Sequence, residues 1–142
     1  LPRNITSTYE MFKNCTKFNS DISGWDTSRV TDMTSMFDNC HIFNQPIGSW
    51  NTSKVETLSS TFLEARSFNQ DISLWDVSKV YSFELTFYAA TAFNQDLSQW
   101  CVTNHPSAEE GRINGFDLDT TSWTLPRPVW GTCPRGEDNP AV

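Results

Sequence analysis

Apolar residues return along this chain at a fixed interval of 25 positions, with no insertion to break the register. We call a set of residues 25 positions apart a column, and each 25-residue period a coil. The apolar columns are Trp25, Trp50, Trp75 and Trp100; Phe12, Phe37, Phe62 and Phe87; Phe18, Phe43, Phe68 and Phe93; Ile22, Ile47, Ile72 and Leu97; and Ile5, Val30, Val55 and Val80. This repetition predicts a solenoid, in which stacked coils cover one another's apolar faces.

Within each coil, apolar spacings of three, four and three residues predict one face of a helix. Val30, Met33, Phe37 and Cys40 show this spacing, which the next two coils repeat. We therefore expect helices at about 30–41, 55–66 and 80–91, and a partial helix near 5–15. The N-cap positions before these segments are occupied by Ser28, Ser53 and Ser78, and Ser53 with Glu56 fits a capping box.

The segment after each helix, such as 43–50, is too short and too polar for a second helix. We expect a turn and a short strand there, with one strand per coil stacking into a parallel sheet. The fold class expected is therefore α/β, with one helix and one short parallel strand per coil. An Asn column lies beside one Phe column, and we expect its amides to bond to the backbone of the next coil; its members are Asn19, Asn44, Asn69 and Asn94.

The repeats divide the chain into three expected regions. Residues 1–104 form about four coils, and the first of these is truncated, so we expect further repeats before it or a partner that covers its open side. Residues 105–134 are apolar enough to form a C-terminal cap over the last coil. Residues 135–142 are short and polar, as in a tail or a linker.

Composition narrows the class of partner. The 142 residues suit one domain, and 10 Phe and 6 Trp supply a continuous core. The net charge of −7 would repel phosphate backbones, so we do not expect nucleic acid to bind. No apolar run is long enough to span a bilayer.

Four Cys residues allow three pairings, of which we favour Cys101 with Cys133, since it would tie the cap to the last coil. Cys15 and Cys40 share a column. Neighbouring helices lie about 8–10 Å apart, beyond the reach of a disulfide, which favours two buried thiols; a tighter spacing would reverse this interpretation. Sequons at Asn4, Asn14 and Asn51, together with paired Cys, indicate a secreted or cell-surface protein.

The repeat, written F-N-Q-D-I-S-x-W-D-V-S-x-V-x-x-M-x-x-M-F-x-x-A, resembles that of BspA-like leucine-rich-repeat surface proteins, the Mycoplasma-lipoprotein type. The resemblance covers residues 1 to about 104 and extends to the segments 100–104 and 128–134. It implies a leucine-rich-repeat-like solenoid, a surface or secreted location, and roles in adhesion and protein binding without enzymatic activity. This chain departs from the pattern at four polar positions, namely Ser20, Pro46, Gly48 and Asn51.

One polar face is the expected binding surface, and we expect it to be regular and exposed. Its residues are Gln45, Gln70, Gln95, Asp71 and Asp96. Carboxylates of neighbouring coils, about 4.8 Å apart, could instead bind calcium or serve a glycosidase, although copied repeats do not provide the two unequal environments that catalysis needs. A solvated face without a ligand is the other alternative.

No catalytic residues, metal ligands or cofactors are expected. His41 and His105 have no second ligand at a zinc-binding spacing, and no phosphate-binding Gly loop occurs. We expect a non-enzymatic extracellular or cell-surface module for protein–protein interaction or adhesion. The alternatives are a structural element of a filament or surface layer, built from further copies of the repeat, and a glycan- or calcium-binding module.

Overall fold

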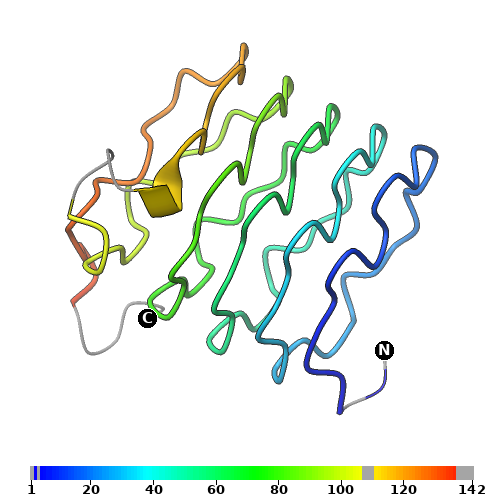
Figure 1. Cartoon of the computed structure of the whole chain (residues 1–142), viewed down its shortest axis with the longest axis horizontal. Coiled ribbons are helices and arrows are strands. Elements are labelled where there is room, and N and C mark those ends of the chain that lie inside the picture. Colours follow the sequence, from blue (N-terminus) through cyan, green and yellow to red (C-terminus); the bar gives the residue numbers. More distant parts are fainter. Residues whose placement is uncertain (1, 3, 107–110, 137–142) are drawn as a thin grey trace.

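The computed structural model describes residues 2, 4–106 and 111–136, and shows successive coils lying side by side in a row (Figure 1). Regular secondary structure is sparse in these residues. It consists of the 3-10 helix η1, Gly111–Ile113, and of the isolated parallel bridges Ser7–Asp32, Asp32–Thr57 and Thr57–Ser82. The expected α/β solenoid with one helix and one strand per coil is therefore wrong.

The segments predicted as helices are runs of turns instead. In residues 35–40, backbone N–H groups alternate between two kinds of acceptor: carbonyls of the next coil and carbonyls three residues earlier in the same coil. Those of Ser35 and Phe37 donate to the next coil, at Ser59 O and Thr61 O, whereas that of Cys40 donates back to Phe37 O. An α-helix needs every N–H to donate four residues back. The apolar spacing of three and four was misleading because reverse turns also return the chain to one face at that interval.

Backbone conformation explains why no helix propagates through these turns. Each coil has two residues with positive φ, four positions apart. They are Glu10 and Asn14, Ser35 and Asn39, Ser60 and Glu64, and Leu85 and Ala89, with φ between 53° and 65°. A left-handed residue interrupts a right-handed helix. Ser28 and Ser53 are accordingly not N-caps; each donates its N–H and hydroxyl to the side chain two residues earlier, Asp26 or Asn51.

The expected strand in 43–50 is also absent, and this segment consists of turns and extended links. Parallel pairing occurs on the other side of each coil, at 7, 32, 57 and 82, inside or beside the segments predicted to be helical. There, Glu56 N donates to Thr31 O and Tyr81 N donates to Glu56 O, both at 2.8 Å. The coils are thus joined by backbone bonds along one side and, as described below, by side chains along the other.

The core lies between these two sides and consists of stacked rings. The Phe12, Phe37, Phe62 and Phe87 rings follow one another at centroid distances of 5.9, 5.6 and 5.4 Å. Trp50, Trp75 and Trp100 each donate Nε1–H to a backbone carbonyl of the preceding coil; Trp75 Nε1, for example, donates to Ile47 O at 3.0 Å. Phe62, Phe68 and Phe93 are fully buried, so the apolar columns form one continuous core.

The chain after Asn104 adds one more coil to the stack, and this coil is reached after five more residues than the 25-residue repeat would need. Phe83, Phe87 and Ala89 donate their N–H groups to Arg112 O, Phe116 O and Leu118 O, 29 residues onward rather than the usual 24. Trp123 stands at right angles to Phe93, with the ring centroids 4.9 Å apart. Residues 111–132 therefore cover the last coil. The expected tail lies outside the described residues from 137 onward.

Candidate interaction surface

The side of the stack opposite the bridges is joined by the Asn column. Asn19 Oδ1 accepts the backbone N–H of Asn44 at 2.9 Å, and Asn44 Oδ1 accepts that of Asn69 at 3.0 Å. At the end of the row, Asn94 Oδ1 accepts the N–H groups of Thr124 and Leu125. Each amide thus supplies an acceptor where a β-sheet would use a backbone carbonyl.

The Gln column adds a second bond between the same coils. Gln45 Nε2 lies 3.0 Å from both Asn19 O and Asn19 Oδ1, and Gln70 and Gln95 repeat this arrangement on Asn44 and Asn69. The donor ends of these half-buried residues are therefore occupied in holding the coils together. Their Oε1 atoms accept no hydrogen bond from the described protein and remain available as acceptors.

Asp71 and Asp96, the carboxylates expected on this face, are exposed and fixed by local turns. Asp71 Oδ1 accepts the N–H of Ser73 at 2.9 Å, and Asp96 Oδ1 accepts both the N–H and the hydroxyl of Ser98. Hydrogen bonds from these serines hold the pKa of both carboxyls below their usual value. Both are thus ionised at neutral pH, whereas a glycosidase needs one of its two carboxyls protonated.

The coil at 43–50 lacks this Asp–Ser turn because both partners are replaced together. Pro46 stands in the Asp column and Gly48 in the Ser column. Proline fixes its own φ without a side-chain bond, so it can replace the turn's carboxylate. A Cβ on Gly48 would overlap the carbonyl oxygen of Asp71, so the neighbouring coil passes too close for a side chain.

These observations define the polar face, by which we mean Gln45, Gln70, Gln95, Asp71 and Asp96. The structure places the three Gln residues in a row along adjacent coils, and Asp71 and Asp96 beside Gln70 and Gln95; Pro46 occupies the Asp position in the coil of Gln45. What these residues present outward is acceptor atoms and negative charge. The arrangement therefore fits a partner that supplies hydrogen-bond donors and positive charge.

The three sequon asparagines are all exposed. Asn51 lies in a turn, where its Oδ1 accepts the N–H and hydroxyl of Ser53. Asn14 Oδ1 accepts a bond from Asn39 Nδ2 at 2.9 Å. Asn4 makes no side-chain bond to the described protein. Exposure makes each position accessible, and glycosylation itself stays a prediction.

The described residues contain no group of three His, Cys, Asp or Glu side chains that could hold a metal ion, and they enclose no pocket. His105 is buried, with Nε2 2.9 Å from Val80 O, and His41 lies in another coil. No helix in the described parts of the chain has the length and apolar character needed to cross a bilayer.

The structure joins Cys101 and Cys133 in a disulfide, which ties the covering segment to the last coil. Cys15 and Cys40 are free thiols, the first exposed and the second buried. The helix spacing of 8–10 Å that argued against a bridge between them does not apply, because both residues lie in segments built from turns and not in helices. The coils are instead as close as paired strands.

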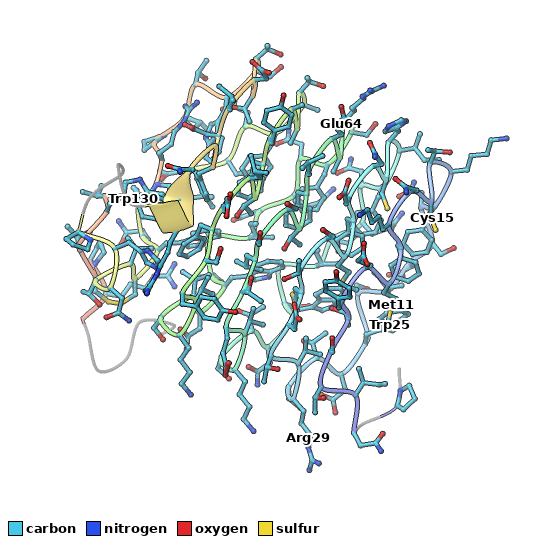
Figure 2. All side chains as sticks on the ribbon, viewed as in Figure 1. Met11, Cys15, Trp25, Arg29, Glu64 and Trp130 are labelled. Carbon is cyan, nitrogen blue, oxygen red and sulfur yellow. A yellow bond between two sulfur atoms is a disulfide. The ribbon has the colours of Figure 1, made fainter. Side chains whose placement is uncertain are left out.

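A basic column was missed in the sequence, although the same 25-residue alignment reveals it. Arg29, Lys54 and Lys79 are all exposed, and none of them forms an ion pair with the described protein. Each follows an identical Asx turn, and Arg29 projects from the lower edge of the row in Figure 2. This basic edge is separate from the polar face.

Comparison with known proteins gives one match. A family model described as "Mycoplasma protein of unknown function, DUF285" matches residues 4–123. No curated protein and no solved structure matches the chain.

Proposed function

The chain belongs to this DUF285 family, and we propose that it is a non-enzymatic, extracellular or cell-surface module that binds a protein partner, as in adhesion, through the polar face. The partner class that fits is a basic segment, with Lys or Arg side chains opposite these residues. One observation carries the proposal. The Gln Nε2 donors of the polar face are bonded to the preceding coil, so the atoms left for a partner are the Gln Oε1 and Asp carboxylate oxygens, repeated from coil to coil.

Rigidity supports this use of the polar face. Gln70 is bonded to the preceding coil and Asp71 to its own turn, so neither needs to be ordered when a partner binds. Little side-chain entropy is then lost on association. The net charge of −7 also favours encounter with a basic partner.

The extracellular location rests on separate observations. A disulfide joins Cys101 to Cys133, and Asn4, Asn14 and Asn51 are exposed in sequons. Disulfides persist in oxidising compartments and N-glycans are added in the secretory route. Both features favour a secreted or surface protein.

A peptide array tests the proposed partner class. We expect the purified chain to bind Lys/Arg-rich peptides in preference to neutral or Asp/Glu-rich peptides of equal length, and to lose binding as salt rises. The double variant Asp71→Asn/Asp96→Asn keeps the turn acceptor, as Asn51 does naturally, and removes two charges. It should weaken binding about tenfold.

The matched control is Glu56→Gln/Glu84→Gln, which removes two charges from exposed residues on the bridge side of the coils. It should change the affinity less than about twofold. Equal weakening by both pairs would mean that net charge alone attracts the peptides. No preference for basic peptides would remove the proposed partner class.

The alternative of an assembly element has one observation in its favour. Phe12, Phe18 and Trp25 are only partly buried, whereas their counterparts in later coils are buried. Trp25 and Met11 mark this open side of the first coil in Figure 2. A further coil of the same pattern would cover it, whether from a longer form of the protein or from another molecule. Concentration-dependent sedimentation that Phe18→Ser abolishes would favour assembly.

A further inference from the structure

Cys15 and Cys40 occupy the same position in two neighbouring coils, at one edge of the row, where Figure 2 shows Cys15. In the next two coils the column contains Ala65 and Ala90, which are fully buried. The slot is therefore small and does not require sulfur. Two thiols occur only where the first coil, the least buried one, meets the second.

The two residues converge on a single atom, the carbonyl oxygen of Phe12. It accepts the backbone N–H of Cys15 at 2.9 Å, and the thiol of Cys40 reaches across from the second coil to the same oxygen at 3.0 Å. The sulfur of Cys40 thus already lies in the first coil's turn, beside the backbone of Cys15.

The spacing of the two coils suits a disulfide. Asn14 N donates to Asp38 O at 2.8 Å on one side of the pair, and the rings of Phe18 and Phe43 stack at 5.6 Å on the other. Chains paired in this manner have Cα atoms roughly 5 Å apart, within the range of about 4.4–6.8 Å that disulfides span.

We propose that Cys15 and Cys40 form a second disulfide, which closes the first coil onto the second when the chain meets an oxidant of the disulfide class. The two sulfurs would meet after the Cys40 side chain rotates away from Phe12 O and the Cys15 side chain rotates away from Lys13 O, which its sulfur contacts at 3.9 Å. The bond would hold the first coil, whose Phe12, Phe18 and Trp25 are only partly buried, to the second, as the Cys101–Cys133 bond ties the covering segment to the last coil.

The exchange chemistry assigns different roles to the two thiols. Exposed Cys15, as a thiolate, attacks a disulfide such as oxidised glutathione and releases one glutathione. Cys40 then loses its proton, attacks Sγ of Cys15 and releases the second glutathione. Two protein thiols are oxidised and one glutathione disulfide is reduced. Burial raises the pKa of the Cys40 thiol to about 12, so the second step is slow in the folded chain.

The test uses the purified full chain in a glutathione redox buffer, followed by alkylation and peptide mapping by mass spectrometry. We expect a chain lighter by four hydrogen atoms than its reduced form, with one cross-linked peptide containing Cys15 and Cys40. If Cys15 and Cys40 are alkylated while Cys101 and Cys133 are linked, or if the Cys pairs are scrambled, the proposal is overturned.

Stability gives a second readout. Cys40→Ala matches Ala65 and Ala90, so it should fold, and its oxidised form should melt roughly 5–10 °C below the oxidised parent chain. Cys15→Ala, which changes an exposed residue, should give the same loss. Under reducing conditions the difference for Cys15→Ala should vanish. A loss that persists there would indicate packing rather than a bond and would overturn the proposal.

Discussion

At the scale of single residues, polar side chains accept the backbone hydrogen bonds that carbonyl groups accept in regular secondary structure. Asp71 and Asn51 hold turns through their side-chain oxygens, and Asn44 bonds to the backbone of the next coil. The Asn bonds could be predicted from the sequence, because an Asn at the same position of every coil faces the same backbone groups of the neighbouring coil each time. It did not show that the Gln donors are engaged too, since that depends on the distance between coils.

Asp71 gives a prediction with a matched control. Asp71→Ala removes the acceptor for Ser73 N and should cost roughly 0.5–1 kcal/mol of unfolding free energy, a low value because the turn is exposed. Asp71→Asn keeps an acceptor and should cost less. Urea denaturation of both variants measures the difference, and equal losses would contradict a role of Asp71 as turn acceptor.

The same carboxylate predicts a pH dependence. Its pKa is lowered in the folded chain by the bonds from Ser73, so the stabilisation is present above the unfolded value of about 3.8 and is lost as pH falls through the lower folded value. The stability difference between the parent chain and Asp71→Ala should therefore shrink below pH 4. A difference that stays constant down to pH 2 would contradict this linkage.

At the scale of the element, the unit is a coil built from turns. The 25-residue period and the apolar columns could be predicted from the sequence, because identical residues must meet identical neighbours. The helices at 30–41, 55–66 and 80–91 could not be excluded in this way. The helices are excluded by the positive φ at residues such as Ser35, Glu64 and Leu85. Ser, Glu and Leu rarely adopt positive φ, so the sequence gives no reason to expect it there.

Asn44 tests how coils are joined. Asn44→Ala leaves the N–H of Asn69 without its acceptor and removes a bond from Gln70, which should cost about 1–3 kcal/mol. Gln70→Ala removes only the bonds made by the Gln side chain and should cost less. Amide exchange of Asn69, followed by NMR, should accelerate in the first variant and change little in the second. The reverse order would contradict the ladder.

At the scale of the whole molecule, the two sides of the row differ in what they offer. The bridge side is joined by backbone bonds, whereas the opposite side is joined by amide side chains whose remaining acceptors, with Asp71 and Asp96, form the polar face. Of this face, the residues could be predicted from their columns. The proposal of a donor-rich partner could not be reached from the sequence, because it depends on which atoms the fold has already engaged.

Hydrogen–deuterium exchange of the chain, free and saturated with the tightest-binding basic peptide, tests the central claim that the polar face is the contact surface. The account predicts that added protection falls on residues 44–49, 69–74 and 94–99. Protection on 31–34, 56–59 and 81–84 would instead place the contact on the bridge side. Such a result would contradict the account.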